Sequence, residues 1–236
     1  MPDRQKDLVR LSGIKLSKGD STYLVYKSLF RDLQIAIDKY ASGKLLDIGC
    51  GNKPYKALMK SVTEYIGCDI VQSSNNTVDI LSAATKIPVD NNSFDTVFST
   101  QTIEHVEDPV ALCSEAYRIV KPGGYFIVSG PMYWPHHEEP YDFFRFTKYG
   151  FSYILEKAGF EVISIKANGG NWATAGISLI HAIENHIPGT VAGKLLKRLF
   201  YKLQMTVFIN WVFGNLDTKK SNEVNTINFV CIAKKI

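Results

Sequence analysis

The stretch LLDIGCGNKPY, residues 45–55, decides the fold that the sequence predicts. Its apolar start is typical of a buried strand, and Gly49 and Gly51 let the chain turn tightly and approach a ligand without a Cβ in the way. A dinucleotide site needs a third glycine at position 54, where the next helix packs close to the pyrophosphate, but this chain has Pro54. The stretch therefore predicts a strand, a turn and a helix around a ligand without a pyrophosphate, such as adenosine with an amino-acid tail.

Strand-like and helix-like segments alternate along the chain. Helical spacing of apolar residues appears at 20–40, 108–120 and 147–158, and the KPGG segment at 121–124 is a stop signal after the second of these. Such alternation predicts an α/β fold with a mainly parallel sheet wound on both faces, which places ligands outside the carboxyl ends of the strands. The predicted strands are 44–49, 64–70, 77–80, 94–100, 124–130, 160–166 and 227–235.

The composition fits one α/β domain with room for an elaboration. The chain has 236 residues, of which 45% are hydrophobic, and its net charge of +4 is not gathered into long Lys/Arg runs, so no nucleic-acid partner is predicted. The four cysteines form no CxxC pair and the N-terminus is polar, so we expect reduced thiols in a cytoplasmic protein. No apolar run reaches the roughly 18 residues that a membrane span needs.

Polar residues stand at the ends of several predicted strands. Asp69 closes the second strand, where a carboxylate can accept hydrogen bonds from ribose hydroxyls, and Asp79 with Ile80 ends the third, placed to receive an adenine edge. Thr100 and Gln101 end the fourth strand. Any one acid in such a place is as often a helix cap or a solvated loop residue, but several strand ends with this chemistry together predict a ligand site.

These segments resemble one enzyme superfamily. LLDIGCGNKPY, YIGCDI, IPVDNNSFDTVFSTQTIEHVEDP and EAYRIVKPGGYFIVSGP are similar to the class I S-adenosylmethionine-dependent methyltransferases, and within them to the broad group that includes ubiquinone-biosynthesis-type members. The resemblance covers about residues 43–166 and the last strand, and only NKPY departs from the family pattern. It implies S-adenosyl-L-methionine as the cofactor. The cofactor contacts that it implies fall on Asp47, Gly49, Cys50, Gly51, Asp69, Ile70, Asp79, Ile80, Thr100 and Gln101.

The resemblance also implies the domain organisation. We expect a single Rossmann-like methyltransferase domain over residues 1–236, with a seven-stranded, mostly parallel sheet whose last strand is antiparallel. Its expected parts are an N-terminal helical cap (1–42), a cofactor-binding core (43–166), a helical insertion (167–222) and the last strand (223–236).

The segment GPMYWPHHEEPYDFFRFT, residues 130–147, follows the fifth predicted strand and is dense in polar and aromatic residues. In this fold it would lie over the methyl group of the cofactor. His136 or His137 is a candidate general base because imidazole titrates near neutral pH, and Asp142 would orient it. Arg145 would hold a phosphate or carboxylate of the substrate. The same segment also fits a surface loop whose acids pair with Arg145.

Other residues in or near this segment could bind a metal or the acceptor. A metal site is not predicted from His136, His137, Glu138 and Asp142, because neighbouring residues on an extended chain point apart. His105, just past the fourth predicted strand, either faces the acceptor or caps and packs beneath the site.

The expected insertion ends with KLLKRLFYKLQMTVFINWVFGNLD, residues 194–217. Basic residues precede the apolar MTVFINWVF, a pattern that suits a helix lying in a membrane interface. A lid over the active site or a homodimer contact through 172–214 explains the pattern equally well. The expected location is therefore cytoplasmic, and peripheral at the inner membrane face if the membrane interpretation holds. The basic residues are Lys194, Lys197, Arg198 and Lys202.

Three functions remain open from the sequence. The first is O-methylation of a glycan, a lipid-linked saccharide or a small metabolite, since the resemblance extends to bacterial enzymes that modify cell-surface polysaccharides or their lipid-linked precursors. An NAD-dependent oxidoreductase is the second, and Pro54 argues against it. The third is an inactive methyltransferase fold that binds a partner. The sequence identifies neither the acceptor, the oligomeric state nor the histidine that acts as base.

Overall fold

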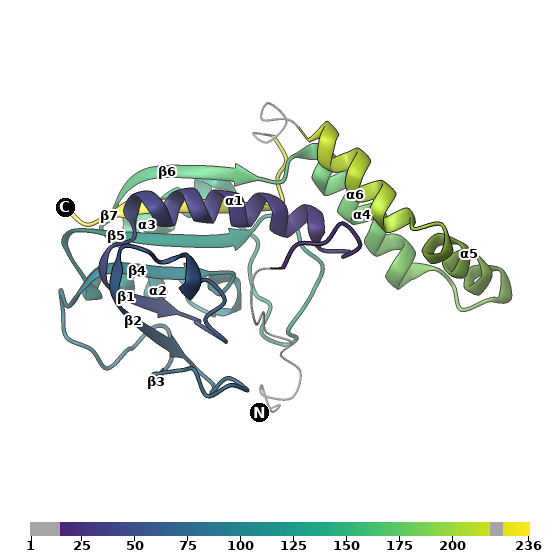
Figure 1. Cartoon of the computed structure of the whole chain (residues 1–236). Helices are drawn as coiled ribbons and strands as arrows, with labels where there is room; N and C mark the ends of the chain where they lie inside the picture. Colours follow the sequence, from purple (N-terminus) through teal and green to yellow (C-terminus); the bar gives the residue numbers. More distant parts are fainter. Residues whose placement is uncertain (1–14, 218–223) are drawn as a thin grey trace. The chain divides into compact units, whose positions relative to one another are not determined.

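The computed structural model describes residues 15–217 and 224–236, apart from the side chains at 185 and 186 (Figure 1). The described chain divides into two compact units. Of the described residues, the first unit contains 32–166 and 229–236, and the second contains 15–31, 167–217 and 224–228. Parts of the expected N-terminal cap (1–14) and of the expected insertion and last strand (218–223) lie outside the described residues.

Seven strands form one sheet in the order β3-β2-β1-β4-β5-β7-β6. Strand β1 pairs in parallel with β2 and β4, β2 pairs in parallel with β3, and β4 with β5, whereas β7 is antiparallel (Figure 1). The predicted fold class is therefore confirmed. The strands are β1 Gly43–Ile48, β2 Val62–Asp69, β3 Ile80–Leu81, β4 Phe94–Thr100, β5 Val120–Pro131, β6 Glu161–Asn168 and β7 Asn228–Lys234.

Side-chain caps mark the amino ends of the second and third helices, α2 and α3. Asp108 accepts a hydrogen bond from Ala111 N at 2.9 Å, with proline in the first turn of α2, and Thr147 accepts one from Gly150 N at 3.0 Å at the start of α3. These start signals were visible in the sequence. The helices are α1 Tyr23–Tyr40, α2 Pro109–Ile119, α3 Lys148–Lys157, α4 Asn171–His186, α5 Val191–Lys202 and α6 Met205–Leu216, and two 3₁₀ turns are η1 Lys56–Leu58 and η2 Ile103–His105.

The predicted end of the helix before 121–124 is confirmed, because α2 ends at Ile119, but the strand that follows begins earlier than the predicted residue 124. Strand β5 begins at Val120, directly after α2, and the KPGG segment lies inside the strand, where the pairing with β4 shifts register after Phe94. A Cβ at Gly124 would lie 2.6 Å from Asp95 O, so the glycine allows the two strands to approach at this bulge. The predicted strand at 77–80 is also misplaced, because β3 contains only Ile80–Leu81.

The central strands are buried on both faces, which is why their sequences are continuous apolar runs. Leu45, Leu46 and Ile48 of β1 and Phe98 of β4 have at most 1% of their surface exposed. Because β2 and β3 lie on one side of β1 while β4 and β5 lie on the other, the strand order reverses between β1 and β4. Ligands of doubly wound sheets bind at such a reversal, outside the carboxyl ends of the strands.

The second unit is a small helical assembly. Ile180 of α4, Phe200 of α5 and Ile209 of α6 form its buried cluster. The amino end of α4 is capped from a distant residue, because Asp217 accepts hydrogen bonds from Gly170 N at 3.0 Å and Ala173 N at 3.4 Å. Within the described residues, no helix combines the length and the apolar character needed to cross a membrane.

Candidate active site

The turn after β1 is held against the end of β2 by its own backbone. Gly49 N and Cys50 N donate to Cys68 O at 2.8 and 3.1 Å, and both Gly49 (φ 77°) and Gly51 (φ 48°) have left-handed backbone conformations. A Cβ on Gly49 would overlap the side chain of Thr102, which follows β4. The glycine therefore lets the turns after β1 and β4 meet at the point where the strand order reverses.

Asp69 links this turn to the end of β2. Its buried carboxylate accepts hydrogen bonds from Gly51 N at 3.0 Å and from Val71 N at 3.3 Å. The neighbouring Ile70 is 52% exposed, an apolar side chain at the carboxyl edge of the sheet. The predicted contact of Asp69 with ribose hydroxyls stays a prediction, and the geometry adds a second role for this carboxylate in holding the glycine turn.

Lys53 explains the departure at NKPY, in a role that no sequence pattern indicated. The Lys53 ammonium forms an ion pair with Asp79, whose Oδ2 also accepts a hydrogen bond from Gly67 N at 2.7 Å. A Cβ at Gly67 would overlap the Lys53 side chain, so glycine makes room for it. Burial opposes ionisation of Asp79, but the hydrogen bonds from Gly67 and Lys53 lower its pKa. Asp79 thus ties β3 to the turn after β1, in addition to the adenine contact that the sequence predicts.

Asp47 is a buried carboxyl beneath the same turn. The Tyr65 hydroxyl donates a hydrogen bond to Asp47 Oδ2, and burial raises the pKa of Asp47 to about 7. Cys50 is buried as well, and burial raises the pKa of its thiol. Asp47 therefore holds its proton over much of the pH range in which an exposed aspartate is ionised.

The end of β4 completes this edge of the sheet. Gln101 has a left-handed backbone (φ 51°), and its N and Nε2 donate to Ser129 O and Oγ of β5, both at 3.1 Å. Thr100 is buried beside it. The residues predicted to contact the cofactor thus lie at the carboxyl ends of β1, β2 and β4 and at the start of β3, which pairs with the last two residues of β2. Their contacts with the cofactor stay a prediction.

The loop at 132–147, between β5 and α3, is organised around Arg145. Its guanidinium donates to both carboxylate oxygens of Asp142, at 2.6 and 2.8 Å, and to the backbone oxygens of Trp134, Pro135 and Phe144 at 2.8–3.1 Å. The interpretation of Arg145 as a substrate ligand stays a prediction, and in this structure its donors are used within the loop. The alternative, in which the loop's acids pair with Arg145, describes what the structure contains.

Asp142 faces both candidate bases. Its Oδ2 accepts a hydrogen bond from His137 N at 3.1 Å and lies 3.3 Å from His137 Nδ1 and 3.6 Å from His136 Nδ1. The His136 side chain is 85% exposed, whereas His137 is largely buried. Burial, with His105 next, lowers the pKa of His137. Burial opposes ionisation of Asp142, but the bonds from Arg145 and His137 hold the pKa of Asp142 below its usual range.

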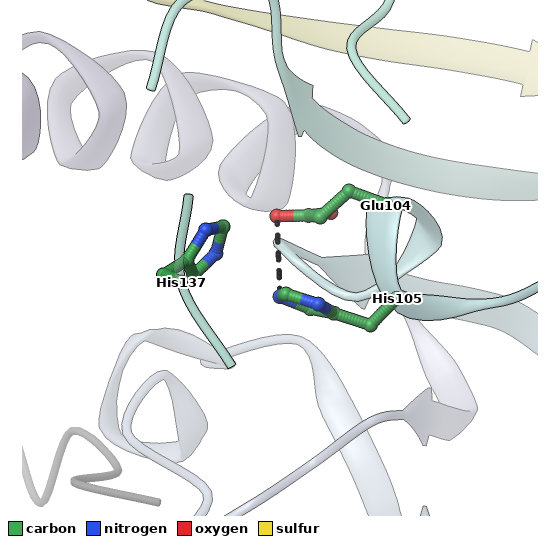
Figure 2. Close-up of side chains that lie close together, drawn as sticks. All are labelled: Glu104, His105 and His137. Carbon is green, nitrogen blue, oxygen red and sulfur yellow. Dashed lines mark ion pairs between the residues drawn. The ribbon is translucent and has the colours of Figure 1, made fainter. Parts of the chain in front are cut away.

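A second cluster joins this loop to the end of β4. Figure 2 shows the side chains of Glu104, His105 and His137 turned toward one another, with their ligand atoms all within 4.8 Å. His105 Nε2 lies 3.9 Å from Glu104 Oε1, and the two imidazole rings meet edge to face at 4.6 Å. The Glu104 side chain is 1% exposed, and burial raises its pKa to about 8. The sequence drew attention to Glu104 and His105 but gave no signal that His137 would join them.

The aromatic residues of the loop divide into two groups. Phe146 is buried, and its ring lies 4.6 Å from the ring of Phe151 in α3, so it anchors the loop in the core. Phe143 is exposed, and Tyr133, Trp134 and Tyr141 are partly exposed. Phe144 is partly exposed as well, but its ring lies 6.0 Å from that of Phe146, beside the anchor. The other four are the aromatic side chains that the loop offers to a substrate.

Part of the chain is similar to known methyltransferases. Residues 46–128 match the family model described as "Methyltransferase domain". A protein of Mycolicibacterium smegmatis, named as a probable S-adenosylmethionine-dependent methyltransferase, is 31% identical over 137 residues, which are 52% of this chain and 53% of that protein. The chain thus spans about half the length of this curated relative.

Solved structures share the fold over nearly the whole chain. A SAM-dependent methyltransferase from Archaeoglobus fulgidus superimposes with a TM-score of 0.56 at 18% identity, covering 88% of this chain and 93% of that one. The [4+2]-cyclase SpnF superimposes with a TM-score of 0.57 at 15% identity, covering 94% of this chain and 86% of that one. Residues 46–128 are therefore similar to methyltransferases of the S-adenosylmethionine-dependent class, whose cofactor is S-adenosylmethionine, and the chain as a whole has their fold.

A pH-dependent stability is expected from Asp47. Because its folded pKa lies above its unfolded value of about 3.9, the retained proton contributes stability that is fully present below about pH 4 and is lost as pH rises through about 7. Asp47→Asn removes this contribution. We therefore expect the difference in free energy of unfolding, variant minus wild type, to be more positive at about pH 8 than at about pH 5. Both free energies are measured by urea unfolding without ligand.

Thr96→Val is the control, since Thr96 is buried on the neighbouring strand and does not titrate. Its difference from wild type should be the same at both pH values. A constant difference for Asp47→Asn would show that the Asp47 carboxyl does not retain its proton on folding.

Proposed function

We propose that this chain is an S-adenosylmethionine-dependent methyltransferase that methylates a hydroxyl group. The proposal depends on one observation: the residues that match the methyltransferase model are also those that form the edge of the sheet where a ligand would bind. The residues that match the methyltransferase model, 46–128, contain the strand ends at which Gly49, Asp69 and Thr102 form a tight, hydrogen-bonded edge. That edge lies where the strand order reverses, which is where a doubly wound sheet binds its ligand.

The proposed reaction is a displacement at the methyl carbon of the cofactor. An acceptor oxygen forms a bond to this carbon as the carbon–sulfur bond breaks, which leaves S-adenosylhomocysteine. The hydroxyl proton passes to a base on the protein. Most of the catalytic effect in such a reaction comes from positioning the acceptor, and a base adds to it.

The 132–147 loop supplies the candidate bases. The Nδ1 atoms of His136 and His137 both lie near Asp142 Oδ2, and the carbonyl of Pro135, which can only accept, favours the His137 tautomer with the lone pair on Nε2. Between them, His137 has the more defined position, because Pro135 O also lies 3.2 Å from its Nδ1. His136 is the more accessible. Either imidazole would receive the acceptor's proton on Nε2.

We further propose that the acceptor is a glycan, a lipid-linked saccharide or a small metabolite. The support is the exposed or partly exposed aromatic set of the loop, Tyr133, Trp134, Tyr141 and Phe143, since aromatic faces stack on sugar rings and other flat substrates. Arg145 no longer supports an anionic substrate group, because Asp142 and backbone oxygens occupy its donors. Bacterial surface-polysaccharide synthesis remains part of the proposal through sequence resemblance alone.

The other functions are less well supported. The matches described above are to methyltransferases and to a cyclase of this fold, so they give an NAD-dependent oxidoreductase no support. An inactive protein that only binds a partner differs from the proposed enzyme in turnover and not in fold.

Cofactor affinity tests the donor side. Asp69→Ala should weaken S-adenosylmethionine binding by about 2–4 kcal/mol in calorimetry, because it removes charge-assisted hydrogen bonds to the ribose. It also removes the acceptor for Gly51 N, so Asp69→Asn, which keeps the size of the side chain, should be measured beside it. Asp90→Ala is the control, an exposed carboxyl ahead of the amino end of β4.

Unchanged affinity in a folded Asp69→Ala variant would remove Asp69 from the cofactor site. If wild type binds NADH and not S-adenosylmethionine, the methyltransferase proposal itself fails.

Turnover tests the acceptor side. With an acceptor found by a radiolabelled-methyl screen, His136→Ala or His137→Ala should lower kcat roughly 100- to 10,000-fold and leave cofactor affinity nearly unchanged, since the imidazole acts on the acceptor and not on the sulfonium. Tyr149→Ala is the control, because this residue is 81% exposed just beyond the loop and has no part in the proposed site, and it should keep the wild-type kcat. Wild-type turnover in both histidine variants would mean that neither is the base, and lost cofactor binding would assign the loop to the donor side.

A further inference from the structure

We propose that Glu104, His105 and His137 form a binding site for a divalent transition metal of the zinc type. The three side chains come from two segments, η2 after β4 and the loop after β5, and converge on one point (Figure 2). Two imidazoles and one carboxylate are a common protein ligand set for zinc and related metals when one coordination position is left for substrate or water. This site differs from the set His136, His137, Glu138 and Asp142. From the sequence, that set is not predicted to bind a metal.

The hydrogen bonds around the two histidines prepare them as ligands. His105 Nδ1 lies 2.9 Å from the backbone oxygen of Tyr141, which can only accept, so a neutral His105 carries its proton on Nδ1 and its lone pair on Nε2. His137 Nδ1 faces two acceptors in the same way, Pro135 O at 3.2 Å and Asp142 Oδ2 at 3.3 Å. Metal-binding histidines are usually held by such a bond from the second nitrogen to a carbonyl or carboxylate.

Glu104 supplies an independent sign that a cation belongs here. Its side chain is 1% exposed, and within the described part of the chain its Oε2 has no hydrogen-bond partner. Buried carboxylate oxygens are normally bonded, so a missing partner calls for an ion or a donor at this point. Glu138 Oε2, 3.8 Å from His105 Nε2, is placed to add a fourth oxygen ligand.

The spacing of the ligand atoms is close to that of a bound site. Ligands at about 2.0–2.1 Å from a tetrahedral metal stand about 3.3 Å apart. Glu104 Oε1 and His105 Nε2 are 3.9 Å apart, and the full set lies within 4.8 Å. Closure onto an ion therefore needs side-chain shifts of roughly an ångström or less.

The inference deepens the proposed function and rests on it for its chemical meaning. A metal with an open position would bind the acceptor oxygen and lower the pKa of the hydroxyl, as it does for water. His137 would then be a ligand rather than the base, which leaves His136 to receive the proton. Binding of the metal, however, requires neither cofactor nor turnover, so its test is separate.

The test is titration of EDTA-treated full-length protein with Zn²⁺ by calorimetry and with Co²⁺ by visible absorption. We expect one equivalent to bind, with a Co²⁺ spectrum of a low-coordinate nitrogen and oxygen site. Glu104→Gln, His105→Ala and His137→Ala should each weaken binding by at least about 100-fold, because each removes a direct ligand and even indirect supports are worth 10- to 100-fold. His136→Ala is the matched control and should bind as wild type does, since this neighbour of His137 is outside the cluster.

Thermal melts of the metal-free variants show whether each one folds. If the histidine variants do not fold, Glu104→Gln still tests the site, because it keeps the shape of the buried side chain. The proposal is overturned if wild type binds no metal, if His136→Ala loses binding as the cluster variants do, or if all variants bind equally. A metal-binding protein without S-adenosylmethionine affinity would sink the proposed function and leave the metal site standing.

A separate observation in the second unit carries a second inference. Helix α5 has no acidic residue, and its exposed surface carries two adjacent rows at helical spacing, which we call the basic apolar face. One row is Lys194, Arg198 and Lys202, and the other is Leu195, Leu199 and Leu203. The remaining basic residue, Lys197, donates to Glu184 O at 2.6 Å and is not part of this face. We infer that the basic apolar face docks on an anionic lipid surface.

The positive charge of the basic apolar face favours an anionic lipid surface over a second copy of the chain as its partner. A second copy of the chain bound through the same face would bring two basic rows into one interface, with no acidic residue of α5 to pair with them. An anionic bilayer complements the lysine and arginine row and accepts the leucine row into its interface. The apolar MTVFINWVF is only partly explained by lipid, because Thr206, Ile209 and Asn210 of α6 are buried within the unit. Phe208 and Trp211, each 53% exposed, remain on its surface.

Co-sedimentation of the full chain with phosphatidylglycerol–phosphatidylcholine vesicles tests this inference. Lys194→Gln/Arg198→Gln/Lys202→Gln should lower the partition coefficient about 100-fold, since each basic residue at an anionic surface contributes a factor of about five. Leu195→Gln/Leu199→Gln should also release the protein. Lys56→Gln/Lys60→Gln/Lys86→Gln, with the same charge change on exposed residues of the first unit, should not.

Salt should weaken binding, because charges at the surface are screened within about 10 Å at 0.1 M. The inference is overturned by absence of binding at low salt or by equal loss in the control triple variant. A concentration-dependent dimer that the leucine substitutions abolish would assign the face to a second copy.

Discussion

The tight turn after β1 is the constraint on which the rest of the first unit depends. Gly49 N and Cys50 N share the carbonyl of Cys68, and Gly51 N is held by the carboxylate of Asp69. These bonds fix the ends of β1 and β2 to each other, and the missing Cβ of Gly49 admits Thr102 from the end of β4. A side chain at position 49 would push the β4 turn away, and the reversal of strand order would no longer form a closed edge.

Much of this architecture was predictable because it depends on local signals. Apolar runs marked the strands, and Asp108 and Thr147 marked helix starts, since capping acts within one turn of the residue itself. The early start of β5 at Val120 was missed for a physical reason that is not local, because the KPGG residues join the strand through an irregular pairing with β4. Lys53 pairing with Asp79, and Arg145 turning inward onto Asp142, likewise depend on contacts that spacing along the chain does not encode.

The fold by itself does not determine the chemistry. A [4+2]-cyclase and a methyltransferase superimpose on this chain about equally well, so the scaffold is shared while the reaction differs. What distinguishes such proteins lies in the loops at the carboxyl edge of the sheet. Here the 132–147 loop is held by the Asp142–Arg145 ion pair, which leaves its histidines in defined positions instead of on a mobile surface segment.

One short segment, residues 101–105, connects the two halves of the candidate site. At its start, Gln101 bonds to Ser129 and Thr102 fills the space beside the glycine turn. At its end, Glu104 O accepts hydrogen bonds from Phe143 N and Phe144 N at 2.9 and 3.3 Å, so the loop after β5 is docked on the same segment. In the proposed reaction, residues 101–105 would therefore position both the methyl donor and the acceptor, and the rate of such a transfer depends strongly on how the two are placed. A ligand on Glu104 would act directly on the segment that sets the distance between the two reacting groups.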